Sequence, residues 1–341
     1  MKKVFLSMFV ALMTATMSFA QNTLVAVLSH ETNVQMFYGS SALVNAVEAA
    51  VSGDVITLSA GTFDKCDITK GITIRGVGAE SDNVTILKDL KSATSGNFSI
   101  MVPQQDVNSF SMEGLKTNET IYINGTSTVF FSKCVINKIS FNSTSSANLK
   151  MVNCSVSTLT LSGSSTLRLS NCRVSGFSNA VNMTSKADFF NCYVTQHGSS
   201  NYAYRCSFIN CIFINTYWGG YTMQNDATAM NCLFIQNNAL SGDGTRIDCY
   251  KATVPNVFVS YDKVDTDLRY GYFVNLPNTL QLIEEAKAAY LGTDGKEVGI
   301  YGGQYPYDLT PTYPRITTLN VAKQASADNK LSVEIEVTAA E

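Results

Sequence analysis

The residues best suited to chemistry lie between positions 195 and 226, where aromatic and polar side chains are interspersed. Tyr and Trp rings stack on the faces of sugars, and amides and hydroxyls beside them bind the sugar hydroxyls. The guanidinium of Arg205 would also pair with a uronate carboxylate. The binding residues that we predict are His197, Tyr202, Tyr204, Arg205, Tyr217, Trp218, Tyr221 and Asp226. The alternative is that these aromatic residues only cover one side of the fold.

Catalytic groups are scarce in the same part of the chain. Residues 130–240 contain only two acids, Asp188 and Asp226, whereas a glycoside hydrolase needs carboxylates that converge at ~5–9.5 Å. His197 has no evident carboxylate partner that would make it a general base. The sequence therefore leaves enzyme activity uncertain and favours a protein without it.

Metal binding has one candidate segment. Asp262, Asp265 and Asp267 lie close together in the sequence, and carboxylate oxygens are ligands that Ca²⁺ prefers. A solvated acidic loop is the alternative interpretation. Zinc is not expected, because no Cys-x-x-Cys pair occurs and the chain has only two histidines, His30 and His197.

A repeat of about 20 residues must position these side chains, and such a period is typical of a solenoid of stacked supersecondary units. Five segments contain Asn followed by Cys, and a sixth has Lys133 in place of the Asn. The successive cysteines are 18 to 21 residues apart. The repeat residues are Asn153, Asn171, Asn191, Asn210 and Asn231 with Cys134, Cys154, Cys172, Cys192, Cys211 and Cys232.

The residues around each Asn-Cys pair predict strands. Apolar residues alternate with polar ones, as at Leu159 and Leu161 or at Leu167 and Leu169, which is the period of a β-strand and not of a helix. We therefore expect coils of about three short strands that stack in parallel ~4.8 Å apart. The predicted fold class is all-β, a parallel β-helix.

The Asn and the Cys of each repeat have separate predicted roles. Asn tolerates the left-handed backbone of a sharp corner, and stacked Asn side chains can hydrogen-bond along the axis as a ladder. The Cys that follows points inward. Disulfides between coils are the alternative, but side chains in register point the same way, which strains a bridge. We expect buried reduced thiols, and any bridge would involve Cys66, Cys206 or Cys249.

The first coils carry a family resemblance. Residues 42–51 read as an amphipathic helix that Ser41 would N-cap and Gly53 would close. Residues 52–63, Ser-Gly-Asp-Val-Ile-Thr-Leu-Ser-Ala-Gly-Thr-Phe, and residues 71–78 then resemble the first two coils of the pectin-lyase-like superfamily of right-handed parallel β-helices. The resemblance covers roughly residues 40–270 and implies a right-handed coil. Enzymes of this superfamily act on acidic polysaccharides, but the fold also hosts non-catalytic adhesins.

The ends of the chain carry other signals. Lys2 and Lys3, the apolar run from Val4 to Ala15 and the sequence Ser-Phe-Ala at 18–20 are typical of a signal peptide. Residues 278–292 read as a helix that begins at Asn278 or Thr279 and ends at Gly292. Residues 316–321 and 331–337 alternate like the strands of a hairpin or of sheet edges, in a tail that resembles those of secreted surface proteins of Bacteroides-type bacteria.

These signals predict five parts of the chain. They are a signal peptide (1–20), an N-terminal extension (21–39), the β-helix (40–275), a helix with closing turns (276–305), and a linker with a β tail (306–341). We expect a secreted, periplasmic or cell-surface protein without a transmembrane span in its mature part.

The composition limits the partners. Net charge is −3 and charged residues make up 15%, which argues against a nucleic-acid partner because no basic stripe could replace counterions. We expect non-catalytic glycan binding or surface display, with a polysaccharide or cell-envelope glycan as partner. One alternative is a polysaccharide lyase or glycoside hydrolase that acts on uronate-containing polysaccharide, and another is an adhesin or envelope assembly component.

Overall fold

The computed structural model describes residues 24–80, 84–87, 97–100, 108–179, 184–196, 202–215, 221–223, 226–235, 240–241, 243–252, 257–260, 280–321 and 333–338. The predicted signal peptide lies outside these ranges. The predicted binding residues His197, Tyr217 and Trp218 and the predicted calcium ligands Asp262, Asp265 and Asp267 also lie outside them.

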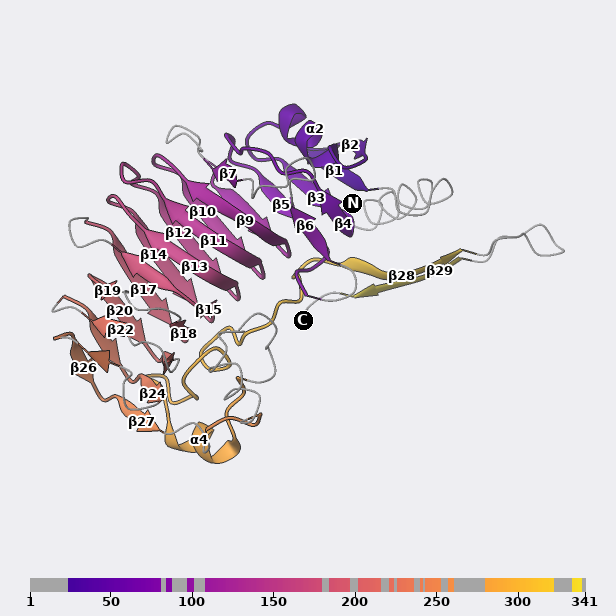
Figure 1. The fold of residues 1–341 in the computed structure, drawn as a ribbon. Coiled ribbons are helices and arrows are strands. Elements are labelled where there is room, and N and C mark those ends of the chain that lie inside the picture. Colours follow the sequence, from indigo (N-terminus) through magenta and orange to yellow (C-terminus); the bar gives the residue numbers. More distant parts are fainter. Residues whose placement is uncertain are drawn as a thin grey trace.

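The chain forms a parallel β-solenoid of about eight turns, and the predicted all-β, parallel β-helix class is thereby confirmed (Figure 1). One long sheet, here called sheet A, follows the whole solenoid. Its strands in spatial order are β2 (Asn33–Tyr38), β1 (Val25–His30), β3 (Val55–Leu58), β5 (Thr73–Arg75), β8 (Phe110–Glu113), β10 (Thr128–Ser132), β12 (Asn148–Val152), β14 (Thr166–Ser170), β17 (Lys186–Phe190), β20 (Cys206–Ile209), β23 (Thr228–Met230) and β26 (Thr245–Ile247).

The second long sheet, sheet B, forms the next side of each coil. Its path is β27 (Tyr250–Ala252), β24 (Leu233–Ile235), β21 (Ile212–Asn215), β18 (Tyr193–Gln196), β15 (Arg173–Val174), β13 (Ser155–Leu161), β11 (Val135–Phe141), β9 (Lys116–Ile123), β6 (Thr85–Leu87) and β4 (Gly61–Phe63). Two more strands pair with this path, β7 (Asn97–Ile100) with β9 and β16 (Phe177–Asn179) with β13.

The third side of the coil changes along the solenoid. Strand β13 pairs with β15 through its first residues and with β16 through its last, so one strand contributes to two sides. In later coils the third side is a separate sheet C, whose strands are β19 (Tyr202–Ala203), β22 (Tyr221–Met223) and β25 (Leu240–Ser241). About three short strands per coil is therefore the arrangement of these later coils.

The core is the dry interior of the coils, filled by the inward residues of each alternating strand. Aromatic rings continue from coil to coil there. The ring centroids of Phe189 and Phe208 are 4.6 Å apart in a stacked arrangement, and those of Phe213 and Phe234 are 4.9 Å apart. The regular ~4.8 Å spacing of the strands favours such stacking, because equivalent side chains lie directly above one another.

Residues with a left-handed backbone form the corner between sheets A and B. Of the nine described non-glycine residues with positive φ, eight directly precede a Cys, and Glu31 is the other. The column contains Lys133, Asn153, Asn171, Asn191, Arg205, Asn210, Asn231 and Asp248, with φ between 47° and 56°. Seven of these residues lie at the corner between sheets A and B. Arg205 lies elsewhere in its coil, because it immediately precedes β20 of sheet A. The left-handed corner that the Asn-Cys repeat predicts is therefore present.

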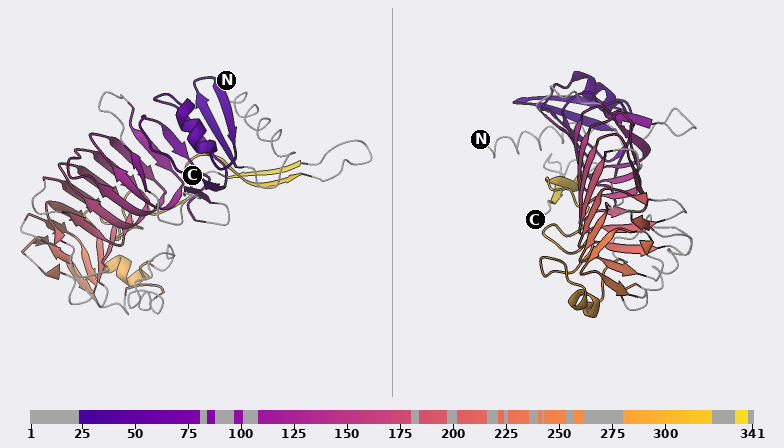
Figure 2. Two further views of the ribbon diagram at one scale, coloured as in Figure 1. Left: turned by 45° about the horizontal axis from the view of Figure 1, so that its top comes forward. Right: turned by 90° about the vertical axis from the view of Figure 1, so that its left-hand side faces the viewer.

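The N-terminal cap differs from the prediction. Residues 25–38, expected in an extension, form strands β1 and β2, which continue sheet A in antiparallel pairing. Helix α2 (Ala42–Ala49) covers this end of the coil (Figure 2). The Ser41 hydroxyl does not cap the helix, because it donates to Asp64 Oδ2 at 2.8 Å. The helix ends before Gly53, and Lys70 Nζ binds the carbonyls of Val47, Glu48 and Ala50 at its C-terminus.

The predicted C-terminal helix is also shorter than expected. Helix α4 covers only Glu284–Ala289, and the residue that precedes it is Ile283, not Asn278 or Thr279. Leu282 instead lies in an extended segment that pairs with Phe258. This segment stays extended because Leu280 and Leu282 are buried against the outside of sheet B, where Tyr193 Oη donates to the Leu280 carbonyl at 3.0 Å.

From α4 the chain returns along the solenoid to its first coils (Figures 1 and 2). We call residues 291–313 the return segment. Its contacts with the corner run from late coils to early coils in order. They join Asn231 Nδ2 to the Leu291 carbonyl (3.4 Å), Asn210 Nδ2 to Thr293 Oγ1 (3.2 Å), Asn171 Nδ2 to the carbonyls of Ile300 and Gly302 (2.8 Å each), and Lys133 Nζ to Asp308 Oδ2 (3.1 Å).

These contacts replace the Asn ladder that we expected. The hydrogen bonds of the Asn171, Asn210 and Asn231 side chains go to the return segment and not along the axis. Asn153 Oδ1 and Asn191 Nδ2 are buried without a hydrogen-bond partner in the described part of the chain. The return segment also includes residues 306–313 of the expected linker, since Thr312 binds Glu113 Oε1 through its backbone N–H (2.7 Å).

The tail forms an antiparallel hairpin of β28 (Arg315–Val321) and β29 (Val333–Thr338), one of the two predicted arrangements. It extends away from the solenoid beside the first coils (Figure 1).

Candidate functional site

The predicted sugar-binding residues that the structure describes lie near the junction of sheets C and A in the later coils. Strands β19 and β22, which carry Tyr202 and Tyr221, are neighbours in sheet C. Tyr204 and Arg205 follow β19, and Asp226 precedes β23 in the next coil. The structure thus brings the backbones of these residues together, as the repeat suggests.

Arg205, however, is engaged within the protein. Its Nε donates to the Ser185 carbonyl (3.1 Å), its guanidinium forms an ion pair with Asp226 (3.5 Å), and it lies 5.7 Å from the centre of the Tyr204 ring. Asp226 Oδ1 also accepts the Arg205 backbone N–H at 2.9 Å. Arg205 therefore fastens three consecutive coils, and its charge is balanced before any ligand arrives.

A second surface with the chemistry of a glycan site lies on the outer face of sheet A, where β10, β12, β14 and β17 pair in parallel register. Lys150 of β12 lies beside Arg168 of β14, and Lys186 of β17 lies beside Thr166 of β14. All three basic side chains are exposed. The Arg168 guanidinium lies over the Phe190 ring, 4.7 Å from its centre. We call this group the basic-aromatic face.

Other residues of the same face suit hydroxyl groups and sugar rings. Phe130 of β10 is half-buried beside Lys150, and Thr128, Asn148 and Thr166 form a polar row along the coils. Asp188 pairs in register with Arg168 and is the acidic residue of β17. The alternation of strands turns these side chains outward, because their neighbours Leu149, Leu167 and Ala187 fill the core.

This arrangement can bind a chain molecule along the solenoid axis. Equivalent positions repeat every ~4.8 Å from coil to coil, so a linear polymer meets a new set of donors at each step. A guanidinium that lies over an aromatic ring still has N–H groups with which it can pair with a carboxylate. The face is rigid because every strand is paired on both sides.

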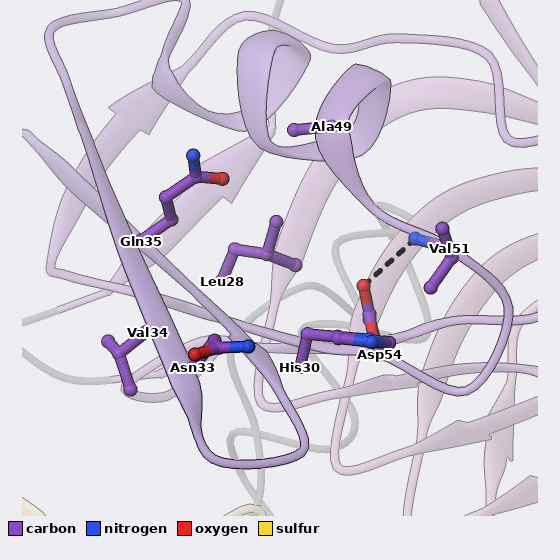
Figure 3. Close-up of a pocket in the computed structure, with 8 residues that line it drawn as sticks. All are labelled: Leu28, His30, Asn33, Val34, Gln35, Ala49, Val51 and Asp54. Carbon is purple, nitrogen blue, oxygen red and sulfur yellow. Dashed lines mark hydrogen bonds and ion pairs between the residues drawn. The ribbon is translucent and has the colours of Figure 1, made fainter.

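A hollow of about 320 Å³ lies at the other end of the molecule, between the β1–β2 hairpin and the end of α2 (Figure 3). His30 Nδ1 and Asp54 Oδ1 are 2.5 Å apart there, and Asp54 Oδ2 accepts the Val51 backbone N–H at 2.8 Å. The hydrogen bond and charge of Asp54 raise the pKa of His30. The hollow is lined by Leu28, His30, Asn33, Val34, Gln35, Ala49, Val51 and Asp54.

Neither the His30–Asp54 pair nor the basic-aromatic face is among the predictions from the sequence. His30 and Asp54 are 24 residues apart, and Asp54 was counted only as part of the first-coil motif. The signal for their contact is that Ser29 pairs with Val55, which sets His30 opposite Asp54. The basic-aromatic face was visible as Lys150, Arg168 and Lys186 at similar positions of successive repeats.

Comparisons with protein-family models, with curated proteins and with solved structures found no match. The fold alone therefore defines the class of this protein, which is a parallel β-solenoid. No group of three or more His, Cys, Asp or Glu residues within the described ranges is placed to hold a metal ion. No helix in the part of the chain that the structure describes has the length and apolar character needed to cross a membrane.

Proposed function

We propose that this protein is an exported, non-catalytic glycan-binding β-helix and that its glycan lies along the basic-aromatic face of sheet A. The observation that carries the proposal is the Arg168 guanidinium stacked on Phe190, with Lys150 and Lys186 exposed on the neighbouring coils. Lys150 and Lys186 form no ion pair with other described residues, in contrast to Arg205. The charges of this face favour a glycan that carries carboxylates.

The pectin-lyase-like relationship, with its right-handed coil, remains part of this proposal. It rests on the first-coil sequence from Ser52 to Phe63 and on the parallel stacking of the coils. Members with that fold include enzymes, so a polysaccharide lyase or hydrolase is the competing function. Adhesion to a host or envelope surface would use the same glycan contact and is included in the proposal.

The test is native affinity electrophoresis in gels that contain polygalacturonate or a neutral galactan. The Lys150→Ala/Lys186→Ala variant should bind polygalacturonate about fivefold more weakly, because two exposed charges each contribute roughly 0.5 kcal/mol. Arg168→Ala should also weaken binding, because Phe190 alone cannot pair with a carboxylate. Salt should reduce the binding of the unmodified protein.

The matched control is Lys251→Ala/Lys287→Ala, which removes the same charge from β27 and α4, away from this face. Equal weakening by both variants, or no retardation of the unmodified protein in any gel, would contradict the proposed site. The same polysaccharides should be incubated with the protein and assayed for unsaturated or reducing ends. Release of such products would replace the non-catalytic function by the enzymatic one.

A further inference from the structure

The hollow at the N-terminal cap combines a buried carboxylate with an exposed imidazole. Asp54 is 5% exposed, while the His30 side chain is 46% exposed at the rim. Both oxygens of the carboxylate have partners, since Oδ1 meets His30 Nδ1 and Oδ2 accepts the Val51 N–H. Asp54 therefore holds the imidazole in one orientation, and Nε2 has no partner within the described residues.

The protonated imidazole of His30 can donate a hydrogen bond in a fixed direction. Once Nδ1 is bound to a carboxylate, the remaining N–H at Nε2 can donate to a ligand. The charged groups that act on His30 are Asp54, at the start of β3, and Glu31, in the hairpin turn, and both raise its pKa. The imidazolium form is therefore favoured to a higher pH than in an isolated histidine.

The hollow is lined by amide and apolar side chains that suit a small carboxylic acid. Asn33 and Gln35 of β2 carry amide groups that can donate to a second carboxylate oxygen. Leu28 and Val51 provide apolar contact, and Val51 is 50% exposed. Figure 3 shows the side chains of Leu28, His30, Asn33 and Gln35 around one space, and the Val34 side chain on the opposite side of β2.

We propose that this hollow binds a small carboxylate ligand, with the carboxylate on His30 Nε2 and the amides of β2, and the body of the ligand against Leu28 and Val51. The imidazole N–H and the two amides match the two oxygens of a carboxylate better than the four oxygens of a phosphate. The volume of about 320 Å³ suits a molecule of monosaccharide size. This site is separate from the basic-aromatic face and does not depend on the proposed function.

The test is an NMR titration of the histidine ring protons of the full mature chain with D-galacturonate. D-galactose, which has the same ring without the carboxylate, and inorganic phosphate serve as the other two probes. We expect a saturable shift of the His30 signals with galacturonate at pH 5.5 and no saturable shift with galactose. Phosphate should bind at least about tenfold more weakly, because it has no body that can contact the apolar wall of the hollow.

Binding should depend on pH in a defined direction. The folded pKa of His30 is raised above the ordinary value of 6.5, so the imidazolium is fully present below pH 6.5 and is lost as pH rises through the raised pKa. Affinity for galacturonate should therefore be constant between about pH 5 and 6.5 and fall about tenfold or more by pH 9. The His30→Gln variant should lose both the binding and its pH dependence, whereas Tyr305→Ala, at an exposed position of the return segment, should retain them.

Folding and binding can be separated in the same samples. The amide spectrum and thermal unfolding of His30→Gln report whether the cap still folds, and Asn33→Ala removes a donor without disturbing the His30–Asp54 pair. We expect Asn33→Ala to weaken galacturonate binding severalfold while the His30 pKa remains raised. Equal shifts with galactose and galacturonate, tighter binding of phosphate, or no saturable shift would each overturn the carboxylate site. These outcomes leave the electrophoresis of the sheet A variants unaffected.

Discussion

Three of the corner cysteines, Cys172, Cys211 and Cys232, accept a backbone N–H that an aliphatic residue would leave without a partner. Cys211 is fully buried, its Sγ donates to the Ile209 carbonyl (3.3 Å), and it accepts the backbone N–H of Cys192 in the preceding coil (3.4 Å). The left-handed residue before each Cys directs this N–H into the coil, where sheet pairing is interrupted. A polarizable sulfur satisfies it without the larger desolvation cost of a hydroxyl.

Substitution of two cysteines in the column tests this role. The Cys211→Ala variant loses a sulfur that accepts a backbone N–H, whereas Cys134→Ala loses one that accepts none from the described residues. Both changes leave a similar small cavity. We expect Cys211→Ala to lower the free energy of unfolding by ~1–3 kcal/mol more than Cys134→Ala, the cost of a buried unsatisfied N–H. Urea unfolding measures both, and equal losses would contradict a hydrogen-bonding role.

At the scale of elements, the return segment is a structural part of the solenoid. It covers a second apolar cluster on the outside of sheet B, where Ile212, Ile214 and Leu233 face Val298 and Ile300. Its far end is held by the Lys133–Asp308 ion pair. Burial raises the pKa of Asp308, but hydrogen bonds from Thr310 and Lys133 outweigh this and keep the pKa below its usual value.

Loss of one apolar contact should loosen the whole return segment. Ile300 is 1% exposed, and its replacement by Ala should destabilise the protein by ~2–4 kcal/mol, because it leaves a cavity against sheet B. Backbone amides of residues 291–313 should then exchange faster with deuterated solvent. Tyr305, 56% exposed in the same segment, provides the control, and Tyr305→Ala should leave both measurements nearly unchanged. Exchange that is unaffected in Ile300→Ala would show that the segment is held elsewhere.

At the scale of the whole molecule, the stacking of coils determines the state of the cysteines. All nine cysteines are free, and seven of them are buried. Burial raises the pKa of the partly exposed Cys66 to about 12. Cys249, half-exposed in the last coil, also has a raised pKa, because of its hydrogen bond with the Cys232 side chain and its burial. Reactive thiolates are therefore scarce even where solvent reaches the sulfur.

Thiol titration of the folded and the denatured protein tests this state. Without reductant, the folded protein should react slowly with an aromatic disulfide reagent at pH 8, because the sulfurs are buried or have raised pKa values. In guanidinium chloride all nine thiols should react at once. A total of seven or fewer in the denatured protein would demonstrate disulfides and would contradict the column of reduced thiols.

The sequence alone determined the coil, because its signals are local and recur. Alternation at Leu159 and Leu161, and the Asn-Cys pair at intervals of 18 to 21 residues, specify strand, corner and period without reference to distant residues. The outward Lys150, Arg168 and Lys186 also follow from that period once the inward residues are known.

Only the tertiary structure decided what lies against the coil. Asn171 binds Ile300, Lys133 binds Asp308 and His30 meets Asp54, and the first two pairs are separated by more than 120 residues. Packing of residues 280–302 against the solenoid also shortens helix α4. It directs the Asn side chains to the return segment instead of an axial ladder. A period describes each repeat in isolation, whereas these contacts depend on where one chain segment docks on many repeats together. The return segment docks through burial of the apolar outer face of sheet B, which no local pattern records.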